Sequence, residues 1–151
     1  MSKGLVRTLL VAAFAFAGPM ALVIDLVARH FVVGSQPAEV QQFLADHVTP
    51  LAWAIVPGPL LGGLVGFFRY PVRYRKALAR AAKDPSTSPE DAAERADMEA
   101  LFIGTTLAQL PALLGDFSVM LGARLAPALC ATSISVAAVL AIGAFARRRI
   151  A

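Results

Sequence analysis

Three polar side chains lie in a row within one long apolar stretch of this sequence, residues 101–123. Thr105, Gln109 and Asp116 are spaced 4 and 7 residues apart, which places them on one face of an α-helix. A hydroxyl, an amide and a carboxylate on one stripe could bind a cation or relay a proton. They could equally hold neighbouring helices together through hydrogen bonds, each contributing about 0.6–2 kcal/mol. The sequence is compatible with both roles.

Two further residues bear on such a site, Pro111 and Asp25. Pro111 has no N–H, so the carbonyl of Leu107 loses its helical partner beside Gln109. Asp25 lies in an earlier apolar stretch and is a second candidate ligand for a proton or an ion. Arg29 follows Asp25 by four residues on the same helix face, and an ion pair between them is the alternative role that we favour for Asp25.

The elements that would position these groups are apolar blocks long enough to cross a bilayer. The chain has 151 residues, 58% of them hydrophobic, whereas soluble domains average about 45–50%. A helix of about 20 residues spans the hydrocarbon core, and backbone groups in lipid must be hydrogen-bonded internally, which favours helices. The sequence predicts an all-α integral membrane protein, a single bundle of four transmembrane helices over about residues 5–27, 51–68, 101–123 and 125–146.

The segments between the blocks have their own patterns. Residues 38–47 are amphipathic and are predicted to form a short helix on the outer membrane surface. Pro57-Gly58-Pro59 should break or kink the second block. Residues 69–97 form a basic loop, near the end of which Ser88 and Pro89 are typical of a helix start. The third helix is therefore expected to begin well before it enters the membrane.

Glycines in the second block and hydroxyls in the fourth bear on how the helices pack. Gly58, Gly62 and Gly66 recur every four residues, with Gly63 beside them. Small residues at this spacing let another helix approach closely, which predicts a helix-packing ridge. In the fourth block the hydroxyl side chains can bond back to their own helix, and we assign them no function; they are Thr132, Ser133 and Ser135.

The distribution of basic residues predicts the orientation. With four crossings, 12 of the 14 Lys and Arg residues fall on one side. The positive-inside rule then places both termini and the loop 69–97 in the cytoplasm, in a cytoplasmic (inner) membrane. The basic residues expected to face lipid head groups there are Arg69, Arg73, Arg75, Lys76, Arg147, Arg148 and Arg149.

Several function classes are disfavoured by the sequence. The net charge of +4 comes from basic residues beside apolar blocks, which favours a membrane surface over nucleic acid as the partner. Motifs of hydrolases, P-loop proteins and zinc proteases are absent, and the loop 69–97 is too short to fold as a catalytic domain. His30, His47 and Cys130 stand apart from one another, which does not favour a metal site. We therefore expect no independent catalytic activity, no cofactor and no metal.

One family resemblance adds to this interpretation. The sequence LFIGTTLAQ, residues 101–109, is similar to the second helix of the F-type ATP synthase c subunit, the rotor proteolipid. The Gly-rich block before it and the loop KALARAAKDP, residues 76–85, resemble that family's first helix and cytoplasmic loop. The resemblance covers about residues 51–123. It implies assembly of many copies through the glycine ridge and a cytoplasmic loop, which agrees with the charge distribution.

The sequence departs from that family at the functional position. Gln109 stands where the family has its ion-carrying carboxylate, and glutamine does not titrate. Asp116 would have to be the carrier, or carriage has been lost. The blocks at residues 5–27 and 125–146 also have no counterpart in the family's simple hairpin.

Three functions follow as expectations. The first is a proteolipid-like subunit of a membrane complex, with a proton or cation pathway along the third helix and copies of itself as partners. The second is a non-catalytic accessory or assembly subunit bound to other membrane subunits. The third is a small independent transporter, for which broken helices such as the one at Pro57-Gly58-Pro59 are a pointer. The lipid bilayer is a partner in all three.

Overall fold

A computed structural model describes residues 3–81, 83 and 87–148 of the chain, and within this part it is all-helical without strands. The helices are α1 (Lys3–Val32), α2 (Ala38–Ile55), α3 (Pro57–Ala81), α4 (Pro89–Met120) and α5 (Leu125–Arg148). Four stretches of the described chain are long and apolar enough to cross a membrane: Leu5–Val32, Ala38–Ala81, Pro89–Met120 and Leu125–Arg148. The predicted all-helical fold with four candidate membrane spans is confirmed.

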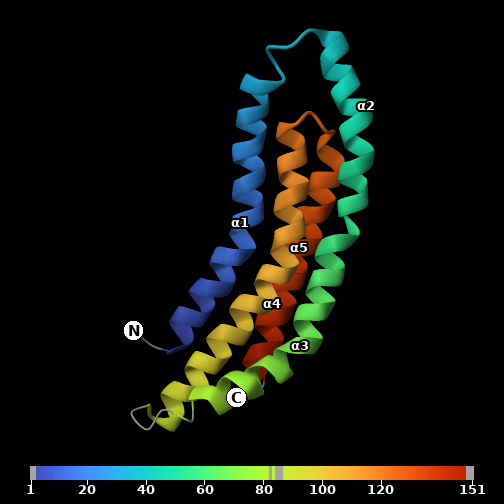
Figure 1. The fold of residues 1–151 in the computed structure, drawn as a ribbon. Helices are drawn as coiled ribbons and strands as arrows, with labels where there is room; N and C mark the ends of the chain where they lie inside the picture. Colours follow the sequence, from blue (N-terminus) through green and yellow to red (C-terminus); the bar gives the residue numbers. More distant parts are fainter. Residues whose placement is uncertain (1–2, 82, 84–86, 149–151) are drawn as a thin grey trace.

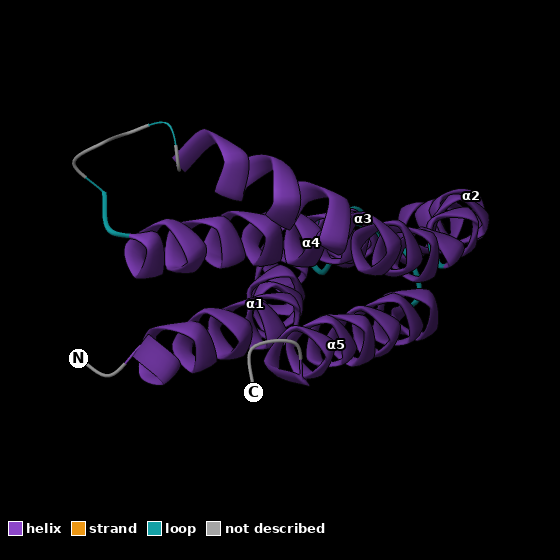
Figure 2. Cartoon of the chain, turned by 90° about the horizontal axis from the view of Figure 1, so that it is seen from below, coloured by secondary structure: helices purple, strands orange, loops and turns teal. Residues whose placement is uncertain are grey.

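Helix α4 is the centre of the bundle, because it contacts each of the other four helices. Figure 1 shows α4 and α5 as a hairpin, with α1 on one side and α2 and α3 following one another along the other. Seen from the end, α3 and α4 lie over α1 and α5 (Figure 2). Among the described residues, α1 contacts α4 and α5 but neither α2 nor α3. The start of α1 and the end of α5 lie at the same end of the bundle.

Residues 38–47, expected as a short helix on the membrane surface, are part of a longer helix in the structure. These residues form the first half of α2, which continues to Ile55, so the second span consists of two helices in sequence and not of one helix over residues 51–68. The break falls at Val56, directly before Pro57. Proline has no N–H to donate to the carbonyl of Trp53, and that carbonyl accepts from the N–H of Val56 at 3.2 Å. A break at the proline-rich segment is thus confirmed.

The ends of α4 follow the local sequence signals. Ser88 is the N-cap, and its hydroxyl accepts from the backbone N–H of Asp91 at 3.2 Å, which satisfies one of the free N–H groups at the helix start. The other end closes into α5 through a short turn that contains Gly122 with φ of 105°, a backbone conformation that glycine adopts easily. Only seven residues lie between Ala81 at the end of α3 and Pro89 at the start of α4, so most of the basic loop 69–97 is helical.

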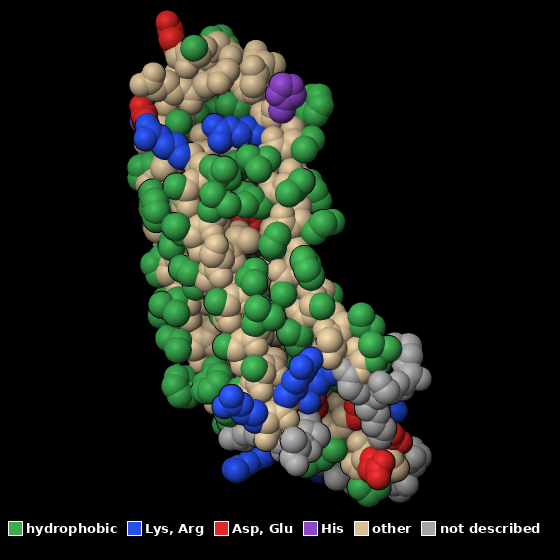
Figure 3. Space-filling model, turned by 180° about the vertical axis from the view of Figure 1, so that it is seen from behind, with side chains coloured by type: hydrophobic (Ala, Val, Ile, Leu, Met, Phe, Trp, Pro, Cys, Tyr) green, Lys and Arg blue, Asp and Glu red, His purple; other side chains and the backbone are tan. Residues whose placement is uncertain are grey.

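The outer surface of the bundle is apolar over most of its length. Figure 3 shows hydrophobic side chains along the molecule, with Lys and Arg gathered toward its two ends. Soluble monomers rarely expose a continuous apolar surface of this size. Such a surface is typical of a protein that contacts lipid. The most exposed of the large hydrophobic side chains include Phe16, Phe31, Leu51 and Phe68.

Candidate functional site

The polar stripe of α4 lies at its interface with α5. Gln109 is 2% exposed and Asp116 is fully buried. The hydroxyl of Ser135 donates to Oε1 of Gln109 at 2.6 Å, and the hydroxyl of Thr132 donates to Oδ1 of Asp116 at 2.6 Å. Thr105, also fully buried, does not join this layer, because its hydroxyl donates to the carbonyl of Leu101 at 2.8 Å in its own helix.

Two atoms of this layer are buried without a hydrogen-bond partner. They are Nε2 of Gln109 and Oδ2 of Asp116. Gly18 of α1 lies directly against the amide, since a Cβ at this glycine would be 2.7 Å from Nε2 of Gln109 and 3.1 Å from Cγ2 of Thr132. An unpaired donor and an unpaired acceptor in an apolar interior each cost free energy. The free Oδ2 of Asp116 is an acceptor that a proton, a cation or a water molecule could satisfy, whereas the free Nε2 of Gln109 is a donor that an acceptor such as a water oxygen could satisfy.

Asp25 of α1 is brought close to this layer. Its side chain is partly buried, and it lies seven residues after Gly18 on the same face of α1, just as Asp116 lies seven residues after Gln109, the residue that Gly18 packs against. The expected ion pair between Asp25 and Arg29 is not formed in the described structure. The guanidinium of Arg29 donates instead to the carbonyl of Ala123, in the turn between α4 and α5, at 2.6 Å. Asp25 thus lies beside Asp116 without that cationic partner.

The glycine ridge packs against α4 of the same chain. A Cβ at Gly62 would be 1.9 Å from the carbonyl oxygen of Leu107, and a Cβ at Gly66 would be 2.7 Å from that of Gly104. The carbonyl of Leu107, which Pro111 deprives of its helical partner, is therefore covered by the backbone of α3. It does not belong to the layer around Gln109. Assembly of copies through this face would require α4 to be displaced.

The remaining two glycines of this group contact different helices. A Cβ at Gly58 would be 2.6 Å from Cβ of Pro111 in α4. A Cβ at Gly63 would be 2.6 Å from Cβ of Ala138 in α5. Helix α3 therefore packs closely against both α4 and α5. It does so on the side of these two helices that lies away from α1.

The predicted head-group residues differ in their surroundings. Arg69, Arg75, Lys76, Arg147 and Arg148 are exposed. Arg73 is half-buried, and its Nε is buried without a hydrogen-bond partner. Arg149 lies outside the described residues.

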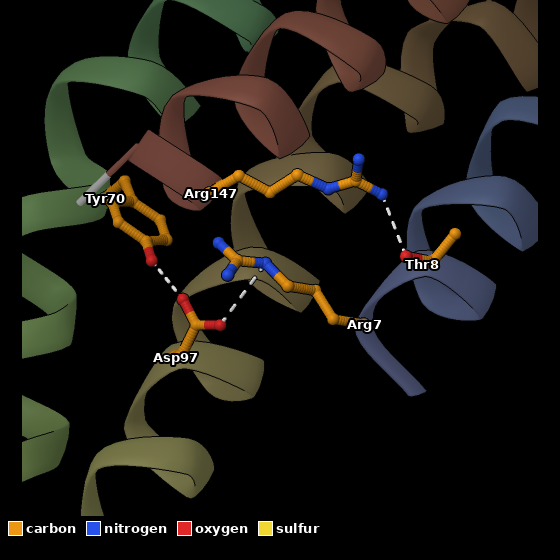
Figure 4. A network of polar contacts seen from close by, with 5 residues as sticks. All are labelled: Arg7, Thr8, Tyr70, Asp97 and Arg147. Atoms are coloured by element: carbon orange, nitrogen blue, oxygen red, sulfur yellow. Dashed lines mark hydrogen bonds and ion pairs between the residues drawn. The ribbon is translucent and has the colours of Figure 1, made fainter. Parts of the chain in front are cut away.

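Sequence reasoning missed a buried polar network at the same end of the bundle (Figure 4). Asp97 of α4 is 5% exposed; it accepts a hydrogen bond from the hydroxyl of Tyr70 and lies 3.6 Å from Nε of Arg7. The sequence pattern assigns Asp97 to the cytoplasmic loop 69–97. It counts Arg7 only among the basic residues that predict the orientation of the chain in the membrane. One signal was present, because Asp97, Leu101 and Thr105 are spaced four residues apart and continue the buried face of α4.

Comparisons with family models, with curated proteins and with solved structures each found no match to this chain. The functional argument therefore rests on the residues and their arrangement. Within the part of the chain that the structure describes, no group of three or more His, Cys, Asp or Glu residues is placed to hold a metal ion.

Proposed function

We propose that this chain is a multi-pass protein of the cytoplasmic (inner) membrane, with both termini in the cytoplasm, and that it holds a proton or small cation at Asp116. The observation that carries the proposal is a fully buried carboxyl group whose Oδ2 has no hydrogen-bond partner. A charged carboxylate without a cationic partner is costly among apolar helices. Binding of a proton or small cation at Oδ2 removes that cost.

The surroundings of Asp116 favour a proton over a metal cation. Its Oδ1 already accepts from Thr132, which leaves Oδ2 as its one oxygen without a hydrogen-bond partner. Divalent cations such as Mg²⁺ and Ca²⁺ take about six or more oxygen ligands. A proton needs one acceptor atom, which Oδ2 supplies.

A route for the proton follows from the same groups. Asp25 is partly buried on α1, on the same face of this helix as Gly18, so it can exchange a proton between Asp116 and the side of the membrane away from the basic end. Toward the basic end the next polar pair is Gln109 with Ser135. The amide of Gln109 does not titrate, so passage beyond it would use water hydrogen-bonded to the free Nε2.

Membership of a larger membrane complex is the second element of the proposal. It is supported by the resemblance of residues 51–123 to the rotor proteolipid, although Gln109 replaces the carboxylate there. Because the glycine ridge is packed within the chain, partner subunits or further copies would contact the exposed apolar faces, such as that of α1 around Phe16 and Ile24.

A non-catalytic accessory role is favoured by one specific observation. Both Gln109 and Asp116 are bonded to hydroxyls of α5, so the stripe can join two helices without carrying an ion. Such a subunit would tolerate loss of the carboxyl group as long as the hydrogen bond to Thr132 is kept.

The variant Asp116→Asn separates these two roles. Asparagine keeps an oxygen that can accept from Thr132 but cannot bind a proton at this site. In liposomes with an imposed potential and a trapped pH dye, we expect proton flux through the purified chain to fall at least about tenfold, since a positioned proton-transfer group contributes about 10²–10⁴ in rate. Ser118→Ala is the matched control, because it removes a buried hydrogen bond of α4, to the carbonyl of Gly115, without removing a titratable group.

A second measurement does not depend on flux, and it therefore also tests the case in which the chain conducts protons only as part of a larger complex. Infrared spectra of the purified protein are recorded through a pH titration, and Asp116→Asn is expected to abolish one carboxylic-acid band that Ser118→Ala retains. Unchanged flux together with an unchanged infrared titration in Asp116→Asn would contradict the proton site and leave the accessory role.

A further inference from the structure

We propose that Arg7 and Arg147 form a binding site for the phosphate of an anionic phospholipid head group, where the start of α1 meets the end of α5. The two residues are 140 positions apart in the sequence. Nη2 of Arg147 donates to the hydroxyl of Thr8 at 2.8 Å, and Thr8 is the neighbour of Arg7 in the chain. The contact brings both guanidinium groups to one small region (Figure 4).

The positive charge of this region exceeds its negative charge. In the network of Figure 4, Asp97 is the one acidic residue drawn, and it faces Arg7, whereas the guanidinium of Arg147 points to Thr8. Asp97 lies 3.6 Å from Nε of Arg7, which is too far for a hydrogen bond. Arg147 is bound to a neutral hydroxyl. The network therefore holds two cations and one anion, and a further anion would be attracted by the excess positive charge.

The hydrogen-bond donors of Arg7 are also incompletely used. The Arg7 side chain is 12% exposed, and its Nε and Nη2 are buried without a hydrogen-bond partner. A guanidinium has five N–H donors in a planar fork, which matches the oxygens of a phosphate. The site thus offers unused donors in a geometry that phosphate groups bind well.

The depth of the site indicates a lipid as the source of the phosphate. Arg7 lies near the start of the span Leu5–Val32, and Arg147 near the end of the span Leu125–Arg148. Both are therefore at the level of the head groups, at the end of the bundle where basic residues of α3 also gather. Basic pockets between helices at this level bind anionic head groups. Arg147 is exposed, so the site is open toward the membrane surface.

The test measures lipid retention by the full-length protein. Native mass spectrometry of the purified chain is carried out with phosphatidylglycerol and, separately, with phosphatidylcholine. We expect the protein to bind phosphatidylglycerol preferentially, and Arg147→Gln to weaken this binding about tenfold, which is the effect of losing one or two charge-assisted hydrogen bonds. Arg95→Gln is the matched control, since it removes the same charge from an exposed residue near the start of α4, and its effect should stay within about twofold.

Each outcome decides the proposal. Equal losses in Arg147→Gln and Arg95→Gln would show general attraction of surface charge and overturn the site. Equal retention of the two lipids would overturn the preference for an anionic head group. A third arm adds inorganic phosphate to the detergent-solubilised protein. If phosphate raises the melting temperature of the wild type but not of Arg147→Gln while neither lipid is retained, the phosphate site stands and its ligand is a soluble phosphate compound, contrary to the lipid assignment. Melting curves of both variants without ligand check that they are folded.

Discussion

The variant Gly62→Ala is expected to lose about 3 kcal/mol of stability, the upper end of the range for inserting extra atoms into a packed core. A Cβ at this position would be 1.9 Å from the carbonyl oxygen of Leu107, well inside van der Waals contact. The group that it meets is backbone, so no side-chain rotation can relieve the overlap, and α3 would have to move away from α4. The gain of up to about 1 kcal/mol from replacing a helical glycine by alanine offsets only part of this cost.

Two other glycines provide a graded comparison. Gly66→Ala would place its Cβ 2.7 Å from the carbonyl oxygen of Gly104, whereas Gly115→Ala would meet Cβ of Ala131 at 3.4 Å, an ordinary contact. Unfolding of each purified variant in mixed detergent is followed by circular dichroism. The expected order of destabilisation is Gly62→Ala, then Gly66→Ala, with Gly115→Ala close to the wild type. If Gly62→Ala and Gly115→Ala destabilise the protein equally, this result would contradict the close approach of α3 to α4.

The second large effect is expected for Asp97→Ala. Its carboxylate is the acidic group that faces Arg7, and the two side chains are 7% and 12% exposed. Removal of one member of a buried ion pair leaves the other charge without compensation, which costs about 3–5 kcal/mol. In the same unfolding experiment, we expect Asp97→Ala to unfold at a correspondingly lower concentration of the denaturing detergent than the wild type.

Two controls identify the buried charge as the cause. Tyr70→Phe removes the hydrogen bond to Asp97 but no charge, and should cost about 1–2 kcal/mol. The double variant Arg7→Leu/Asp97→Ala removes both charges and is expected to recover much of the lost stability, because an apolar pair is often as stable as a buried ion pair. If Asp97→Ala costs no more than Tyr70→Phe, the ion pair contributes nothing measurable.

The helical organisation could be predicted from the sequence because its signals are local. Blocks of apolar residues give the spans, and Ser88 followed by Pro89 gives the start of α4. The structure of residues 38–47 could not be predicted in this way. Their polar side chains, Glu39 and Gln41 among them, resemble those of a surface helix, but whether the helix ends at residue 47 or continues to Ile55 is decided by its contacts with α4 and α5.

The candidate site was predictable only in part for a related reason. The 4 and 7 spacing of Thr105, Gln109 and Asp116 fixes their common face, and this follows from helix geometry alone. The hydroxyls of Thr132 and Ser135 can bond either to their own helix or to a neighbour. The register of α5 against α4 decides between these possibilities, and a single sequence does not reveal that register.

The contacts of α1 also determine the order in which the protein can be completed during synthesis. Among the described helices, α1 packs only on α4 and α5, and both of these helices are synthesised after it. At translation rates of about 5–20 residues per second, α1 waits roughly ten seconds in the membrane for its partners. During this interval Arg7 has no Asp97 to face, and Gly18 has no Gln109 against it. The nascent chain is therefore most dependent on insertion factors between the emergence of α1 and that of α4, and a chain cleaved between α1 and α2 retains every helix–helix contact that α1 makes.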